Sequence, residues 1–248
     1  MIEVSDLYKS FDQNHVLKGV NLKVHEGKSM AIIGASGQGK SVILKCLLGL
    51  TKPNSGKILL NGIDPNNGQK NIIHSKVGML FQGGALFDSL PIWQNVAFKY
   101  LNGKQKINAI EARRIAVEKL ERVGLKSSFA DNFPSELSGG MQKRVALARA
   151  IATQPEIIFF DEPTTGLDPI MAQVINDLIR ELVVELGVTA ITITHDIQSV
   201  RSVADEVALL HDGIIQWSGP MEQLDKSKNK YLKQFIAGST VGPIETLR

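Results

Sequence analysis

The sequence is short of cysteine, of aromatic residues and of long hydrophobic runs. Cys46 is the only cysteine among 248 residues, so no internal disulfide can form, which fits a reducing compartment. No apolar run approaches the roughly 18 residues that a membrane-spanning helix needs. The N-terminal stretch MIEVSDLYKS has no apolar signal core. We therefore expect a cytosolic protein, which a partner could still hold at a membrane.

The sequence also lacks an excess of charge of one sign. Lysine and arginine total 28 against 25 aspartates and glutamates, which gives a formal net charge of +3. This balance gives no support for binding to nucleic acid or to another polyanion. No internal repeat or low-complexity linker interrupts the chain. The 43% of hydrophobic and 21% of charged residues are ordinary for a globular protein with a substantial core.

Short β-rich runs alternate with helical patterns along the chain. Helices are expected at 39–50, Asn108–Val123 and Pro169–Leu186, where apolar residues recur at helical spacing. Two short helices are expected within Met221–Ile236. This alternation predicts an α/β fold with a mostly parallel sheet, into which a helical middle, about residues 84–150, is inserted. The expected strands are Ile2–Leu7, Val16–Val24, Ser29–Ile33, Ile58–Leu60, Val77–Phe81, Ile157–Phe160, Val188–Thr194, Glu206–Leu210 and Ile214–Trp217.

The segment GASGQGKS, Gly34–Ser41, matches the pattern G-x-x-x-x-G-K-[ST] between an expected strand and an expected helix. Its glycines let backbone N–H groups turn inward around phosphate oxygens, and the helix N-terminus adds partial positive charge. Lys40 can reach the β- and γ-phosphates, and Ser41 can ligate Mg²⁺. A plain glycine-rich turn with a surface lysine is the weaker alternative. The residues assigned to the nucleotide here are Gly34, Ala35, Ser36, Gly37, Gln38, Gly39, Lys40, Ser41 and Val42.

A phosphate loop of this kind needs a carboxylate on a neighbouring strand to hold the metal. Asp161 and Glu162 follow Ile157–Phe160, a run that is apolar on both faces, as in a buried parallel strand. We expect Asp161 to be the magnesium partner and Glu162 to polarise the attacking water. Alone, an Asp-Glu pair after a strand is more typical of a solvated turn, but the upstream phosphate loop favours the catalytic interpretation.

The segment Leu137-Ser138-Gly139-Gly140-Met141 resembles the LSGGQ signature of the ATP-binding cassette (ABC) ATPases, and the resemblance covers nearly the whole chain. A serine and two glycines at a helix N-terminus offer a second phosphate-binding surface. The resemblance implies that Ser138, Gly139 and Gly140 serve the ATP bound to the opposite subunit of a head-to-tail homodimer. It implies a P-loop NTPase core of the ABC type with an N-terminal antiparallel β part. The chain would be a single nucleotide-binding domain, residues 1–248, with a helical subdomain at about 84–150 and a tail at about 220–248.

Other residues match further elements of the ABC family. Phe11 matches the aromatic residue that stacks on adenine, with a core strand phenylalanine as the alternative. Gln82 matches the Q-loop glutamine, which contacts Mg²⁺ and water, and Thr165–Asp168 resembles the D-loop. His195 matches the switch histidine that contacts the γ-phosphate. The remaining histidines are expected to be surface or structural residues, and no zinc site is suggested: His15, His25, His74 and His211.

Two positions depart from the family pattern. Met141 stands where a glutamine is usual, so one polar contact to the opposite nucleotide is expected to be missing. Val42 stands where threonine is common and offers only its backbone N–H. Neither change removes a group that the chemistry requires.

The stretch FQGGALFDSLPIWQNVAF, Phe81–Phe98, together with LSGGM, resembles the ATPases of the Mce-associated lipid transporters. The Mla phospholipid system of the Gram-negative envelope belongs to this branch, and the segments Gln234–Gly238 and Gly242–Ile244 resemble its C-terminal ends. The resemblance implies a transmembrane permease, an Mce-type periplasmic lipid-binding subunit and a small regulatory subunit as partners, at the cytoplasmic side of the inner membrane. Some members of the branch are described as ribonucleotide transporters, so the substrate stays open. Large apolar residues of this stretch are expected to dock the permease or to pack the helical subdomain: Leu86, Phe87, Ile92 and Trp93.

Three other kinds of protein are alternatives. A soluble ABC ATPase, such as one that serves iron–sulfur cluster assembly, would need no permease. A P-loop kinase would phosphorylate a small acceptor, but the LSGGM segment and His195 argue against it. A DNA-maintenance ATPase is disfavoured because no long coiled coil separates the two halves of the site.

Overall fold

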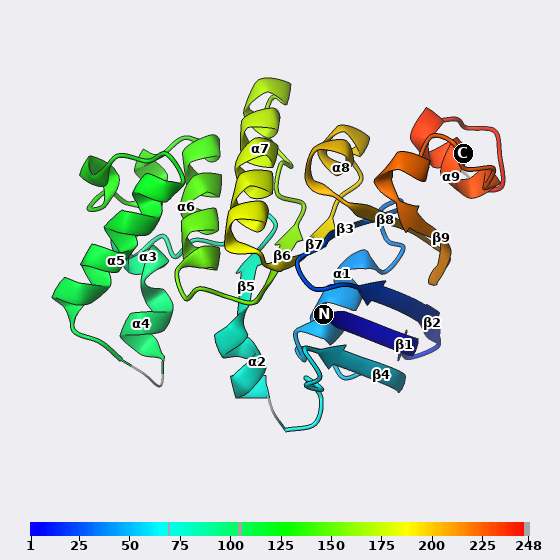
Figure 1. Ribbon diagram of the computed structural model, residues 1–248, viewed down its shortest axis with the longest axis horizontal. Coiled ribbons are helices and arrows are strands. Elements are labelled where there is room, and N and C mark those ends of the chain that lie inside the picture. The colour runs from blue at the N-terminus through cyan, green and yellow to red at the C-terminus, as the bar shows by residue number, and fades with distance from the viewer. Residues whose placement is uncertain (69, 104–105, 246–248) are drawn as a thin grey trace. The chain divides into compact units, whose positions relative to one another are not determined.

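A computed structural model of the protein describes residues 1–68, 70–103 and 106–245 (Figure 1). No helix within these residues combines the length and the apolar character needed to cross a bilayer. The strands are β1 (Ile2–Phe11), β2 (Asn14–Val24), β3 (Ser29–Ile33), β4 (Ser55–Leu60), β5 (Val77–Leu80), β6 (Ile157–Asp161), β7 (Thr189–Ile193), β8 (Glu206–His211) and β9 (Ile214–Pro220). The helices are α1 (Lys40–Leu47), α2 (Lys70–Lys76), α3 (Ile92–Val96), α4 (Phe98–Asn102), α5 (Ala109–Arg122), α6 (Gly139–Ile151), α7 (Pro169–Leu186), α8 (Ile197–Val203) and α9 (Lys230–Ala237).

The chain divides into two compact units. The first joins Met1–His74 to Thr189–Arg248, and the second is Ser75–Val188. The expectation of one domain over residues 1–248 stays a prediction, as do the bounds of its helical subdomain and its tail. Residues 104, 105 and 246–248 of those two predicted segments lie outside the described part of the chain.

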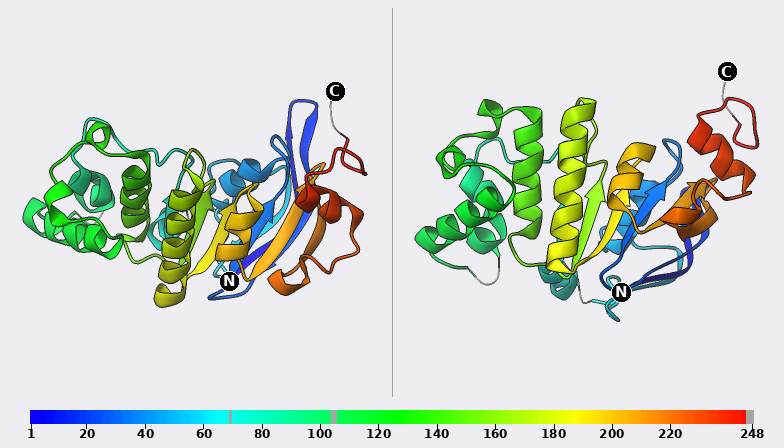
Figure 2. Two further views of the ribbon diagram at one scale, coloured as in Figure 1. Left: turned by 90° about the horizontal axis from the view of Figure 1, so that it is seen from above. Right: turned by 45° about the horizontal axis from the view of Figure 1, so that its top comes forward.

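The first unit contains an antiparallel sheet and the larger part of the parallel strands. Strands β2, β1 and β4 pair in that order as an antiparallel sheet. Strand β3 pairs in parallel with β7 on one side and β8 on the other, and β9 adds an antiparallel edge. All residues of β3 and β7 are buried, as in parallel strands covered on both faces. Figures 1 and 2 show α8 and α9 on one face of these strands and α1 on the other.

The core under α8 and α9 joins residues that are distant in sequence. Val200 of α8 and Leu232 of α9 are buried against Ala31, Ile33 and their neighbours on β8. This apolar layer covers Ala31 and Ile33, which include the last residue of β3. The end of β3, where the phosphate loop begins, is therefore held on a rigid element.

The second unit combines two parallel strands with helices. Strands β5 and β6 pair in parallel, and Figure 1 shows α3, α5 and α6 gathered in one group. Helix α6 also packs against β5. A Cβ atom at Gly78 would overlap the carbonyl oxygen of Ala150, so only glycine permits this approach of β5 to α6.

The expected α/β elements are confirmed, but several bounds differ. Strand β1 continues to Phe11 instead of ending at Leu7, because β2 begins at Asn14 and pairs with the whole extension. Helix α1 ends at Leu47 and not near residue 50. Gly49 adopts φ 65°, and the amide of Leu50 donates to the carbonyl of Lys45, which ends the helix with a left-handed glycine. The first of the two helices expected after residue 220 is only a 3₁₀ turn, Met221–Gln223.

Candidate nucleotide site

The phosphate loop connects the buried strand β3 to α1, and its glycines occupy positions that other residues would strain. Gly34 has φ 152°, and a Cβ atom there would overlap the carbonyl oxygen of Leu210. Gly39 precedes α1 with φ 99°, and its Cβ would lie 3.0 Å from the side chains of Val16 and Leu17. The backbone conformation therefore depends on glycine at both ends of the loop.

Lys40 is the first residue of α1, and its side chain reaches back to the start of the phosphate loop. The side chain is buried, and Nζ donates hydrogen bonds to the carbonyl oxygens of Gly34 at 2.7 Å and Ala35 at 2.9 Å. These bonds hold the amine against the backbone at the start of the loop. Ser41 is exposed one position further along α1, where a hydroxyl at a helix N-terminus is accessible to a ligand.

Asp212 stabilises the loop through one hydrogen bond and one ion pair, which were not predicted from the sequence. The amide of Asp212 donates to Gln38 Oε1 at 2.6 Å, and the Asp212 carboxylate pairs with Lys18 Nζ at 2.6 Å. Asp212 and Gly213 form the two-residue turn between β8 and β9, with φ 50° and 74°, as an Asp-Gly hairpin turn requires. The Asp-Gly pair between two expected strands was the available signal for this turn. Its contact with Gln38 is not visible in the sequence.

His195 and Gly34 lie at the same edge of the first unit. Strands β3 and β7 are parallel, with Ile32 opposite Ile193, and Gly34 and His195 each follow these residues by two positions. Parallel strands present their carboxyl ends together. The structure thus brings the predicted switch histidine and the phosphate loop to one edge.

The residue after His195 anchors the start of α8. Asp196 is partly buried, which would raise the pKa of its carboxyl group. The hydroxyl of Ser199 and the amides of Gln198 and Ser199 donate to that carboxylate and lower its pKa below the ordinary value. The partial positive charge at the N-terminus of α8 also favours the ionised carboxylate. This cap fixes the backbone that carries His195.

Phe11 ends β1 as an exposed side chain. It is 45% exposed, so the alternative of a buried core phenylalanine is wrong. Lys9 Nζ lies 4.8 Å from the centre of its ring, within the range of a cation–π contact. An exposed ring at a hairpin tip is accessible for stacking.

In the second unit, Gln82 and the Asp161-Glu162 pair share one edge. Strands β5 and β6 are parallel, with Leu80 opposite Phe160, and Gln82 and Glu162 each follow by two positions. Glu162 has a left-handed backbone, φ 49°, which redirects its side chain from the line of the strand. Thr165 Oγ1 donates to Glu162 Oε2 at 3.1 Å.

The signature segment forms the N-terminus of α6. The side chain of Ser138 caps the helix by accepting from the amide of Met141 at 3.4 Å. Gly140 is buried, and the end of the Met171 side chain occupies the space next to its Cα. Asp168, in the predicted D-loop, caps α7 by accepting from the amides of Ile170 and Met171 at 3.0 Å. Each of the two predicted family segments therefore supplies the N-cap residue of the helix that follows it.

The stretch after Gln82 contains both core and surface residues. Ile92 is fully buried, so it packs the unit instead of facing a partner. Phe87 is 41% exposed and stacks on Phe98 with a centroid distance of 4.4 Å. Leu86 and Trp93 are partly buried. Only part of the predicted docking segment is accessible.

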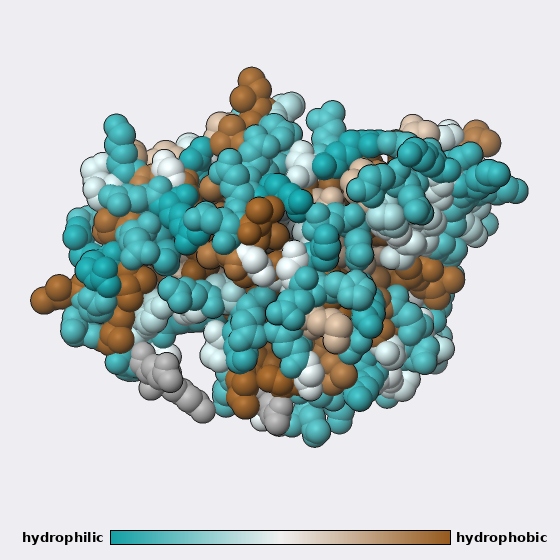
Figure 3. Space-filling view, in the orientation of Figure 1, coloured by the Kyte–Doolittle hydropathy of each residue, from teal (hydrophilic) through white to brown (hydrophobic). Residues whose placement is uncertain are grey.

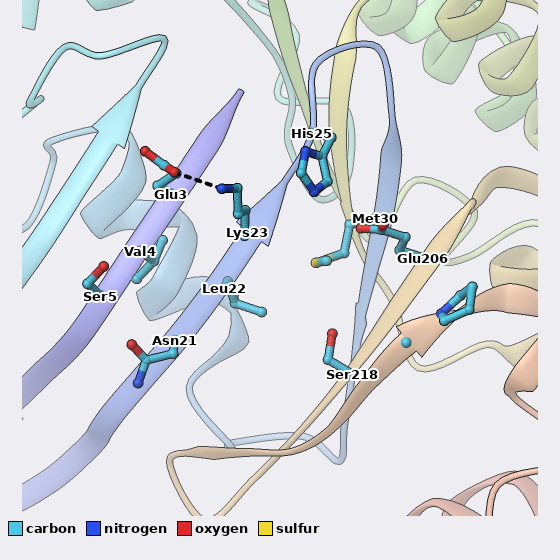
Figure 4. Close-up of a pocket in the computed structure, with 12 residues that line it drawn as sticks. Glu3, Val4, Ser5, Asn21, Leu22, Lys23, His25, Met30, Glu206 and Ser218 are labelled. Carbon is cyan, nitrogen blue, oxygen red and sulfur yellow. Dashed lines mark ion pairs between the residues drawn. The ribbon is translucent and has the colours of Figure 1, made fainter.

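A cavity of about 450 Å³ lies in the first unit at the antiparallel strands (Figure 4). Its lining includes Met30, Glu206 and the ion pair between Lys23 and Glu3 at 3.3 Å. None of the described residues that were assigned to the nucleotide lines it. The face drawn in Figure 3 is mostly hydrophilic, with hydrophobic residues in separate groups, as on an ordinary protein surface.

The fold and the phosphate loop define a P-loop nucleotide-binding protein, and comparison with known proteins identifies its family. The family model described as "ABC transporter" matches residues 17–165. The chain is 40% identical over 247 residues to the intermembrane phospholipid transport system ATP-binding protein MlaF of Haemophilus influenzae, with 98% of this chain and 93% of MlaF covered. It is 39% identical over 246 residues to a probable ribonucleotide transport ATP-binding protein of Mycobacterium leprae, with 98% and 70% covered.

A solved structure agrees with this assignment. The structure of a dimeric ATP-binding cassette in a post-hydrolysis state with ADP and phosphate superposes with a TM-score of 0.81 and 33% identity, covering 89% of this chain and 99% of that one. The chain belongs to the ABC transporter family, as an ATP-binding subunit of the branch that includes MlaF. It is an ATPase with the ABC fold, and the kinase alternative is excluded.

Proposed function

We propose that two copies of the chain close over two ATP molecules and hydrolyse them. Lys40 contacts the β- and γ-phosphates, and the N–H groups of residues 34–42 surround them. Phe11 stacks on the adenine. Glu162 orients the attacking water, and His195 contacts the γ-phosphate. Ser138, Gly139 and Gly140 act on the ATP of the other copy.

The observation that carries this proposal is the alignment of the strand ends. Gly34 with His195, and Gln82 with Glu162, each occupy equivalent positions two residues beyond a parallel-strand pair. ATP hydrolysis relies on positioning and charge stabilisation more than on covalent chemistry by the protein. Rigid, buried strands supply such positioning.

The oxygen donors of three side chains fit Mg²⁺. We assign the Ser41 hydroxyl, the Gln82 carbonyl oxygen and the Asp161 carboxylate to it. Mg²⁺ prefers hard oxygen ligands, with one or two carboxylates beside substrate phosphates and water. When bound, the ion neutralises charge on the β- and γ-phosphates.

We further propose that the chain drives a transmembrane permease at the cytoplasmic side of the inner membrane and that the cargo is a phospholipid. The support is the identity to MlaF over nearly the whole length of both chains and the resemblance of Phe81–Phe98 to Mce-associated ATPases. An Mce-type lipid-binding subunit and a small regulatory subunit would complete the complex. A relative of similar identity is described as a probable ribonucleotide transport protein, so the test must also detect a ribonucleotide cargo.

Purification of the full chain from membranes tests this proposal. A C-terminally tagged chain is extracted in mild detergent, and the proteins and lipids that copurify are identified by mass spectrometry. We expect a permease with bound phospholipid to copurify. A tagged Lys40→Ala chain is the control for nucleotide-dependent association. Copurification of a permease with ribonucleotide and without phospholipid would reject the cargo, and a chain free of any membrane protein would favour the soluble ABC ATPase.

A further inference from the structure

Arg149, near the end of α6, holds the turn that follows Gln82. Its Nη2 donates to the carbonyl oxygen of Gly84 at 2.6 Å, and its Nη1 donates to that of Ala85 at 2.7 Å. The side chain is partly buried. Two short bonds from one planar guanidinium fix both distance and direction, which a single donor could not do.

The turn itself needs an external restraint. Gly83 and Gly84 have φ 74° and 81°, and Ala85, which is not a glycine, has φ 45°. A left-handed alanine is unfavourable and persists where its surroundings impose it. The amide of Gly84 donates to Phe81, so Gln82 lies inside this turn. Its backbone direction depends on the carbonyls that Arg149 holds.

A second buried side chain continues the restraint. Asn95 is fully buried on α3; its Oδ1 accepts from the amide of Phe87 at 2.7 Å. Its Nδ2 donates to the carbonyl oxygens of Phe87 at 3.1 Å and Leu90 at 2.9 Å. Arg149 and Asn95 together hold both ends of the segment from Gly84 to Leu90, which follows Gln82. The sequence pattern gave neither residue a role, because both bind backbone groups, and the groups that Arg149 binds lie more than 60 residues away in the chain.

We call Arg149 and Asn95 the clamp. Helix α6 joins the Arg149 end of the clamp to the signature segment. Ser138 caps its N-terminus, and Arg149 lies eleven residues further on. A helix rises about 1.5 Å per residue, so the two sites are roughly 16 Å apart on one continuous element. Figure 1 shows α6 as a single uninterrupted helix beside α3 and α5.

We propose that Arg149 is a positioning residue for ATP hydrolysis, which fixes the direction of the Gln82 side chain and links it to the helix that begins at Ser138. The inference rests on the proposed role of Gln82. A displacement of the signature end of α6 would move the guanidinium and, with it, the carbonyls of Gly84 and Ala85. The rate of hydrolysis would then depend, through Gln82, on the position of the signature segment.

The test is a double-mutant cycle on the purified full chain. Arg149→Met and Gln82→Ala are measured alone and together for kcat and for ATP affinity, with thermal unfolding as the check of folding. We expect Arg149→Met to lower kcat about tenfold to a hundredfold, as displacements of about 1 Å do, with ATP affinity within about twofold. The double variant should be no slower than Gln82→Ala, because both remove the same interaction.

Arg144 offers a matched control on the same helix. Its Nη1 donates to the carbonyl oxygen of Val123 at 2.9 Å, away from the Gln82 turn. Arg144→Met should lower the unfolding temperature and leave kcat close to wild type. If Arg149→Met does not fold, Arg149→Lys carries the same test against Arg144→Lys, with an intermediate loss of kcat because a point donor cannot hold two carbonyls.

Two results would overturn the inference. One is an unchanged kcat in the folded Arg149 variant while Gln82→Ala is slow. The other is a double variant whose loss is the product of the two single losses. A wild-type kcat in Gln82→Ala would instead reject the proposed role of Gln82, and the inference would fall with it.

Discussion

Lys143 and Lys119 are two lysines that are both 5% exposed but have different surroundings. Lys119 Nζ pairs with Glu118 at 2.8 Å. Lys143 Nζ makes no hydrogen bond within the described part of the chain. Burial lowers the pKa of Lys143, although the charges of Glu162 and Asp161 raise it in part. The folded protein therefore bears a cost for keeping this ammonium charged.

Lys143→Met is expected to stabilise the protein at pH 7 by about 1–3 kcal/mol, since a buried polar group without a partner is removed. Because the folded pKa of Lys143 is lowered, the unfolded chain binds more protons between that pKa and the ordinary value. Wild-type stability should therefore rise with pH in that range, and the gain from Lys143→Met should shrink. Urea unfolding at pH 7 and about pH 9.5 measures both. Lys119→Met is the control, and an equal gain there would contradict this account of Lys143.

Cys46 is a small apolar core residue. It is buried in α1, and burial raises the pKa of its thiol against the smaller opposite effect of Lys9. Cys46→Ala should keep ATPase activity and lose about 1 kcal/mol of stability, since only a buried sulfur is removed. The native thiol should resist a disulfide reagent that reacts after unfolding in urea. Inactivation of the folded variant would reveal a role for the thiol.

At the scale of elements, α6 presents its capped N-terminus as the proposed contact with the ATP of a second copy. Asparagine and aspartate cap helices about as well as serine, so Ser138→Asn and Ser138→Asp preserve the helix end and differ in charge. We expect Ser138→Asp to bind ATP and fail to dimerise, because its carboxylate repels the opposite phosphates. Ser138→Asn should dimerise better. Light scattering with and without ATP measures this, and equal dimerisation of the two variants would argue against a phosphate opposite Ser138.

The buried parallel strands and their loops could be predicted from the sequence for a physical reason. Strands such as Ile157–Phe160 are apolar on both faces, and the polar residues that follow them must emerge at one edge. Glycine, lysine and carboxylate side chains at these ends therefore indicated a phosphate site. The roles of Phe11, Gln82, His195 and Ser138 came from family resemblance, and they stay proposals.

Short helices and long-range polar contacts could not be predicted. Helices α3 and α4 have five residues each, too few for a periodic pattern. The Asp212 amide donates to the side chain of Gln38, and the Arg149 guanidinium donates to the backbone of Gly84. In each bond the two residues lie far apart in the sequence. Such contacts depend on the packed fold. Residue type and spacing give no signal for them.

At the scale of the whole molecule, transport requires a surface for the permease. Phe87 is exposed beside the clamp formed by Arg149 and Asn95, so a glutamate there is solvated in the free chain. Phe87→Glu should bind ATP like the wild type and lose the permease, because a desolvated carboxylate in a contact costs several kcal/mol. Pull-down of the permease measures this. The control is Ile110→Glu, at a residue 85% exposed in the first turn of α5; loss of the complex there too would show an effect of charge alone.

The central claim is that the chain hydrolyses ATP through Glu162 in a site completed by a second copy. Its most direct test measures ATP hydrolysis and ATP-dependent dimerisation of Glu162→Gln in parallel. The amide keeps the size of the side chain and removes the carboxylate that orients water. We predict that hydrolysis falls about a hundredfold or more, while ATP binding persists and the dimer accumulates. A variant that turns over ATP at the wild-type rate, or that stays monomeric with ATP bound, would contradict the account.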